Sequence, residues 1–142
     1  MIAMAGYRFL DHMTDAFIEA HGGTLEEAFE QAARGLVDTM VDISDVRPEI
    51  EVKIEAEGHD IESLLFEWLD KVMLLLVADG MAMSEFSVAI NGHTLKAVAK
   101  GEKLDLARHR YKVEIKAVTY HEMFVKQDSR NDKVTVRFLL DL

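Results

Sequence analysis

Apolar residues recur at three- and four-residue steps in two long stretches, the spacing of one buried face of an α-helix. The first stretch follows Thr24, which has Glu27 three residues later, as in a capping box. Its apolar stripe is Leu25, Ala28, Phe29, Ala32, Leu36 and Met40. The second stretch, 61–79, has a wider stripe of Leu64, Leu65, Trp68, Leu69, Val72, Leu75 and Leu76. Met73 and Leu74 widen it further; that surface could serve a partner, but we expect burial.

Elsewhere apolar and polar residues alternate with period two, which is typical of strands with one face in water. The alternation predicts strands at 7–10, 16–20, 50–56, 86–90, 95–99, 113–126 and 134–138. Asn91-Gly92 separates two of them and is the pair favoured in type I′ hairpin turns. The stretch 101–110 loses the alternation and is predicted to be a polar connection.

The predicted order is β-β-α-β-α followed by successive hairpin strands, which indicates the α+β class. We expect a mostly antiparallel β-sheet with two main helices packed on it, in two main layers. The chain of 142 residues has no Ser-, Pro- or Gly-rich linker, so a single domain over 1–142 is expected.

Composition narrows the chemistry and the location. There is no Cys, which excludes disulfides, thiolate metal ligands and a cysteine nucleophile. The N-terminal residues 1–6 lack the basic region of a signal peptide, and the longest apolar run, Val72 to Ala78, is far below the ~18 residues of a membrane span. We therefore expect a cytoplasmic protein with no membrane partner.

Charge bears on the partners. The formal net charge of −10 arises from 26 acidic and 16 basic residues. It disfavours direct nucleic-acid binding, because such binding depends on contacts between cations and phosphates. The same charge would steer the chain toward a basic surface, such as that of an enzyme that itself binds nucleic acid. Alternatively, the charge only keeps the domain soluble.

The main candidate for chemistry is the segment 11–15 read together with Asp141-Leu142 at the chain end. Two carboxylates and a chain terminus can supply the oxygen ligands that a hard cation prefers. The further polar candidates are His12, His109, Tyr120 and His121. The residues alone favour an ordinary turn at 11–15, since Asp is common in turns. No Walker loop, G-x-S-x-G elbow or H-E-x-x-H motif is present, so no enzyme class is indicated.

Six short strings nevertheless follow one another in the order of a known family. They are His12-x-x-Asp15, Thr24-Leu25-Glu26-Glu27-Ala28-Phe29, Leu64-Leu65-Phe66-Glu67-Trp68-Leu69, Gly101-Glu102-x-Leu104-Asp105-x-x-x-His109, Lys116-Ala117-Val118-Thr119-Tyr120-His121-Glu122-Met123 and Asp141-Leu142. Each string is weak alone, but together they closely resemble the archease family over nearly the entire chain. The resemblance departs in the first string, where Met13-Thr14 replaces the family's usual Thr-Ala.

The resemblance implies a non-enzymatic protein cofactor of the tRNA-splicing RNA ligase, which seals 2′,3′-cyclic-phosphate and 5′-hydroxyl ends. It implies that the chain promotes guanylylation of the ligase's active-site histidine and supports repeated turnover. It also implies a divalent cation, Ca²⁺ first and Mg²⁺ or Mn²⁺ as alternatives, bound by Asp15, Asp141 and Leu142. The residues expected to face the partner or to support the site are His12, His109, Tyr120 and His121.

Two other functions remain open from the sequence. One is a general chaperone or adaptor for RNA-modifying proteins, for which the wide apolar surface of 61–79 would serve. The other is a metal-dependent hydrolase with Asp15 and Asp141 as metal ligands and His12 as the general base. The missing nucleophile signature counts against the hydrolase.

Overall fold

The computed structural model describes residues 4–10 and 14–142, and both predicted helices are present. The strands are β1 (Gly6–Leu10), β2 (Ala16–Gly22), β3 (Ile50–Glu57), β4 (Met81–Asn91), β5 (Thr94–Lys103), β6 (Ala117–Asp128) and β7 (Lys133–Asp141). The helices are α1 (Leu25–Met40), the short 3₁₀ helix η1 (Ile43–Asp45) and α2 (Ile61–Val77). None of the helices in this described part is both long and apolar enough to cross a membrane.

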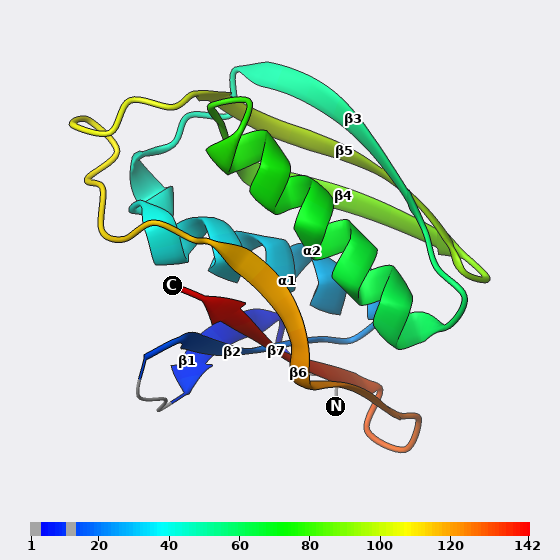
Figure 1. The fold of residues 1–142 in the computed structure, drawn as a ribbon. Helices are drawn as coiled ribbons and strands as arrows, with labels where there is room; N and C mark the ends of the chain where they lie inside the picture. Colours follow the sequence, from blue (N-terminus) through cyan, green and yellow to red (C-terminus); the bar gives the residue numbers. More distant parts are fainter. Residues whose placement is uncertain (1–3, 11–13) are drawn as a thin grey trace.

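The predicted class, antiparallel strands with two helices packed on them, is confirmed. Within the described residues the strands divide into two sheets, with the orders β1-β2-β7-β6 and β3-β5-β4. Figure 1 shows α1 and α2 between the two sheets; α1 packs on β2 and β4, and α2 on β3 and β6. The helices thus form a middle layer instead of one of two layers. This arrangement explains why both helices carry wide apolar surfaces, since each has a sheet on two sides.

The core lies where the two helices meet. Trp68 of α2 is fully buried, and its indole N–H donates to the carbonyl oxygen of Phe29 in α1 at 2.9 Å. The predicted stripes of both helices line this core. Of the two extra apolar residues on α2, Met73 is buried as expected, whereas Leu74 is 47% exposed and the prediction of its burial is wrong. Leu74 lies beside β3 and stays partly open to solvent.

The predicted hairpin between β4 and β5 is confirmed, but its turn is displaced by one residue. Asn91 remains in the ladder, paired with Thr94, so Gly92 and His93 are the two turn residues. Gly92 alone of these two has a positive φ, +64°. A positive φ at the first central residue only is the pattern of a type II′ turn, in which glycine avoids the steric cost.

The chain between β5 and β6 differs most from the predicted secondary structure. β5 continues to Lys103, through the start of the predicted polar connection, and β6 begins only at Ala117. Ile115 is buried without belonging to a strand, so the alternation at 113–117 reflects burial alone. This loop, 104–116, is attached to the end of α1 by backbone bonds: the amide of Lys112 donates to Met40, and the carbonyl of His109 accepts from Asp42, both at 2.8 Å.

One buried carboxylate joins three strands of the first sheet. Glu19 in β2 accepts hydrogen bonds from Nε of Arg8 in β1 and from Nε of Arg137 in β7, each at 2.8 Å. The hydrogen bond from Arg8, with that from Arg137, lowers the pKa of Glu19 although burial opposes this. The buried charge is therefore compensated by a guanidinium on each neighbouring strand.

Candidate functional site

The register of β2 and β7 brings Asp15 and Asp141 to one end of the sheet. Ala16 pairs with Leu140 and Phe17 with Leu139. The next register position beyond Ala16 sets Asp15 opposite Asp141. Directly opposite residues of antiparallel strands share a face of the sheet, so the two carboxylates come from distant parts of the sequence to one corner.

The other side of Asp141 is held by β6. Asp141 pairs with Ala117, and its carbonyl oxygen accepts from the amide of Lys116 at 2.8 Å. Leu142 is half-buried and packs against the core. Asp141 is therefore held by the sheet, and Leu142 by its packing against the core. We refer to Asp15, Asp141 and Leu142 together as the carboxylate corner.

The donor set of the carboxylate corner fits a hard cation. Two aspartates and the carboxylate of Leu142 offer oxygen atoms only, as Ca²⁺ prefers, and water would complete a shell of roughly 6–8 ligands. Within 4–10 and 14–142, no group of three or more His, Asp or Glu side chains is close enough to hold a metal ion. A cation at this corner would therefore depend on the Leu142 carboxylate and on water. His12, predicted beside the site, lies outside the described residues.

Tyr120 and His121 lie in an irregular part of β6, three residues or more beyond the pair Ala117–Asp141. The register of β6 against β7 shifts between Thr119 and Phe124, and Glu122 within this bulge has φ +57°. Tyr120 is 51% exposed and stacks on Phe66 of α2, with ring centroids 4.2 Å apart and planes at 6°. His121 is exposed. Such bulges redirect side chains and are common beside functional sites.

The third candidate imidazole, His109, is fully buried and faces no solvent. Its Nδ1 accepts from the amide of Asp105 at 3.0 Å, and its Nε2 lies 2.8 Å from Oε2 of Glu102. Because Nδ1 must be unprotonated to accept, the proton of the neutral ring is on Nε2 and is donated to Glu102. Of the two predicted roles, facing a partner or supporting the site, this placement is compatible with support.

Glu102 is the centre of that buried group. Its carboxylate also accepts from the amide of Arg47 at 2.9 Å and pairs with the guanidinium of Arg108. The hydrogen bond from Arg108 is the largest of the interactions that hold the pKa of Glu102 at about 2, against the opposing effect of burial. The ionised carboxylate thus anchors the loop 104–116, whose last residue donates to Asp141.

Sequence reasoning finds His109 but not its partner Glu102 or the ion pair with Arg108. Nothing in the spacing shows that the loop folds back onto β5. A signal was available, since Glu102 and His109 belong to one of the six strings that carry the family resemblance. Position 101 in the same string requires glycine for a steric reason, because a Cβ on Gly101 would overlap the backbone of Ala82 and Met83.

Comparisons with known proteins agree over almost the whole chain. The model of the Archease protein family matches residues 7–142. Protein archease of Sulfolobus acidocaldarius is 38% identical over 141 residues, covering 98% of this chain and 100% of the relative. Protein archease of Thermococcus gammatolerans is 39% identical over 128 residues, covering 87% and 90%. The solution structure of Methanobacterium thermoautotrophicum protein 1598 matches with a TM-score of 0.80 and 35% identity, covering 96% and 99%.

Proposed function

The chain belongs to the archease family, and on that premise we propose that it is a non-enzymatic activator of the tRNA-splicing RNA ligase. In this role it promotes guanylylation of the ligase's active-site histidine and allows the ligase to turn over repeatedly. The chain acts by binding the ligase protein, not by binding RNA. The net charge of −10 supports binding to the ligase protein and not to RNA, since a negatively charged chain repels a polyanion and attracts a basic enzyme.

We further propose that the carboxylate corner is the part of the chain that activates the ligase. Asp15, Asp141 and the Leu142 carboxylate hold a divalent cation, with Ca²⁺ as the first candidate and Mg²⁺ or Mn²⁺ as alternatives. A cation held by these residues would offset the repulsion among the carboxylates and would supply positive charge toward the phosphates of the ligase's nucleotide site. The single observation that carries this proposal is the β2–β7 register, which ends at the pair Ala16–Leu140 and, continued by one position, sets Asp15 opposite Asp141.

The surface next to the carboxylate corner completes the proposed ligase contact. Tyr120 and His121 are exposed on β6 and offer an aromatic ring and an imidazole to a partner. Tyr120 is kept in one orientation by its stack on Phe66, which lowers the entropy lost on binding. His109 and Glu102 act behind this surface by holding the loop that leads to Lys116 and Asp141.

The experiment is ligation by the cognate ligase with GTP and a divalent cation, with the ligase limiting and RNA ends in excess. We expect one round of sealing without the chain and many rounds with it. The Asp141→Asn variant should fail to support these further rounds, while Asp132→Asn, a change at an exposed turn carboxylate, should not. An unchanged yield with and without the folded chain would refute the proposal.

A companion assay distinguishes the proposed activator from the alternative of a metal-dependent hydrolase. The chain alone is incubated with nucleotides and phosphoesters in the presence of Ca²⁺, Mg²⁺ or Mn²⁺, and product formation is followed over time. We expect no turnover. Hydrolysis that disappears in Asp15→Asn and Asp141→Asn would instead assign an enzymatic role to the carboxylate corner.

A further inference from the structure

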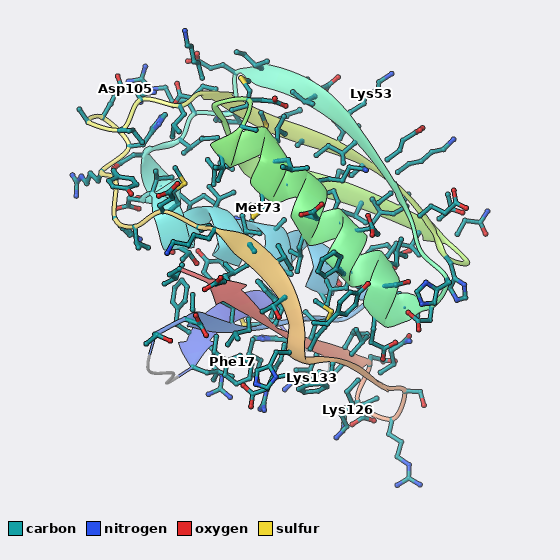
Figure 2. All side chains as sticks on the ribbon, in the orientation of Figure 1. Phe17, Lys53, Met73, Asp105, Lys126 and Lys133 are labelled. Atoms are coloured by element: carbon teal, nitrogen blue, oxygen red, sulfur yellow. The ribbon has the colours of Figure 1, made fainter. Side chains whose placement is uncertain are left out.

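The strand β3 presents an unpaired edge along its whole length. It is the end strand of the order β3-β5-β4 and pairs with β5 from Ile50 to Glu57. In the same register the amide of Gly58 donates to His93 at 2.9 Å, so the even-numbered residues of β3 bond to β5. The odd-numbered residues therefore direct their N–H and C=O groups outward. These residues are Glu51, Lys53, Glu55 and Glu57, and Figure 2 shows Lys53 at the outer margin of the molecule.

The opposite edge of this sheet is closed by α1. The outward amide of Val88 in β4 donates to the carboxylate of Glu30 at 2.8 Å, and the carbonyl of Ser84 accepts from Nε of Arg34 at 3.3 Å. In the described part of the chain, no side chain or loop makes such a bond to the outward groups of β3. β3 is therefore a regular row of free donors and acceptors, onto which an extended peptide can add as a strand.

An apolar groove runs beside this edge, between β3 and α2. It has a volume of about 470 Å³, and Val52, Ile54, Leu74 and Leu75 form its apolar part. The remaining lining residues are charged: Lys53, Glu55, Lys71 and Asp79. Leu74 is one of three large apolar side chains exposed in this region, with Val77 further along α2 and Ile50 at the start of β3. Since the even-numbered residues of β3 face α2, every second side chain of an added strand would reach this groove.

The charges beside the edge determine what kind of strand fits. The exposed side chains of the outward-bonding residues are three glutamates and one lysine. Opposite charges on directly facing strand residues are favourable, and like charges are not. Within the sheet Glu51 and Glu55 face Lys100 and Lys96 of β5, but the side of β3 that an added strand would face carries three glutamates against one lysine. A second copy of the chain would bring the same excess of glutamates, so basic side chains are the better match.

We propose that β3 is a docking edge for an extended basic segment of a partner protein, which adds to the sheet beside β3. The segment alternates basic residues, facing Glu51, Glu55 and Glu57, with apolar residues, which enter the groove at Leu74. This surface belongs to the sheet that does not contain the carboxylate corner. It is therefore a second contact, additional to the proposed activation of the ligase, and it can be tested in the absence of the ligase.

The probe is a blocked peptide of alternating Lys and Val, with the eight-residue length of β3. Amide NMR of the full chain is followed during titration, together with hydrogen exchange at saturation. We expect slower exchange at the outward amides of Glu51, Lys53 and Glu55, while the amides already bonded to β5 change little. A peptide N-methylated on the edge that would face β3 should bind about tenfold more weakly, as expected from the loss of one or two net hydrogen bonds.

Charge variants test the side-chain part of the proposal. The double change Glu51→Lys and Glu55→Lys should weaken binding of the Lys-Val peptide about tenfold, because attraction at two facing pairs becomes repulsion. The matched control is Glu85→Lys, an exposed residue of β4 on the same sheet. Both proteins should melt at a somewhat lower temperature, because Glu51 and Glu85 face Lys100 of β5 and Glu55 faces Lys96, so each change sets two lysines opposite each other. Binding is therefore compared well below the melting range.

Three results would each overturn the proposal. The first is equal binding of the N-methylated peptide, which would mean attraction by charge alone. The second is a set of perturbed amides on another edge strand or at the carboxylate corner, with β3 unaffected. The third is exchange protection of β3 that rises with protein concentration when no peptide is present, which would assign the edge to a second copy of the chain.

Discussion

The imidazole Nε2 of His109 lies 2.8 Å from a carboxylate oxygen of Glu102, and this bond ties the loop 104–116 to β5. The carboxylate of Glu102 also pairs with Arg108 and accepts from the amide of Arg47, so three donors surround its negative charge. We expect Glu102→Gln to lower the free energy of unfolding by about 2 kcal/mol, because a buried charged acceptor is lost while its donors remain. Urea unfolding measures the change. Glu85→Gln on the surface is the control and should stay within about 0.5 kcal/mol of the parent.

The same carboxylate should make stability depend on pH in a defined window. The hydrogen bond from Arg108, first among its interactions, keeps the pKa of Glu102 at about 2 in the folded chain, compared with an ordinary value of 4.5. The folded pKa is the lower one, so the stabilisation is complete above the ordinary pKa and is lost as the pH falls toward 2. The stability difference between the parent and Glu102→Gln should therefore shrink between about pH 4.5 and 2. A difference that stays constant down to pH 2 would contradict this assignment.

Gly101 should not tolerate a side chain. A Cβ at this position would overlap the carbonyl oxygen of Ala82 and the Cα of Met83, and neither backbone atom can move independently. We expect Gly101→Ala to destabilise the fold by about 3 kcal/mol, the upper part of the range for overpacking. In Gly6→Ala the added methyl would make only an ordinary contact with His21, so thermal melting should distinguish the two variants clearly.

Removal of either carboxylate should weaken the cation site. Asp15→Asn or Asp141→Asn loses one negative charge and one strong oxygen ligand, and we expect Ca²⁺ to bind at least about tenfold more weakly in calorimetry. The control Asp132→Asn keeps its backbone, because asparagine also accepts the positive φ of that turn. If both corner variants bind Ca²⁺ as the parent does, the cation lies elsewhere.

The terminal carboxylate can be tested without changing any side chain. Extension beyond Leu142 by a short tag converts its carboxylate to a peptide carbonyl and adds bulk beside Asp141. We expect the C-terminally tagged chain to lose Ca²⁺ affinity and ligase activation about as fully as Asp141→Asn, while an N-terminally tagged chain keeps both. Equal behaviour of the two tagged chains would remove Leu142 from the proposed site.

Association with the ligase should depend on salt. An acidic chain of net charge −10 is steered toward a basic enzyme over a distance that shrinks with ionic strength. The Debye length falls from about 10 Å at 0.1 M salt to about 3 Å at 1 M, so the association rate measured by stopped flow should fall steeply across this range. A rate that does not change with salt would point to an apolar contact.

The sequence predicts best what depends on local pattern. The stripe around Phe29 and the stripe around Trp68 specify two helices, because each repeats over several turns. The partition into two sheets cannot be read in this way, since alternation gives the faces of a strand but not its neighbours. For the same reason Ile115 is predicted in a strand although it is buried within a loop.

The same distinction between local pattern and tertiary pairing applies to the candidate site. The family resemblance identifies Asp15 and Asp141, and the register brings them to one corner of the first sheet. The bond between Glu102 and His109 is invisible from the pattern, because it depends on the path of an irregular loop. Tyr120 and His121 stand in a string whose pattern predicts a regular strand, whereas the structure has a shift of register against β7 at these residues.

The two arginines that bind Glu19 become available at very different times during synthesis. Arg8 precedes Glu19 by 11 residues, whereas Arg137 follows it by 118. While the chain is being made, β2 can pair with β1 early, but its other edge has no neighbour until β7 emerges from the ribosome. Such distant pairing is slow, because a long loop must close before any contact forms. Asp141 arrives with the same strand, so a partner that recognises the carboxylate corner binds only chains that have been translated and folded through β7.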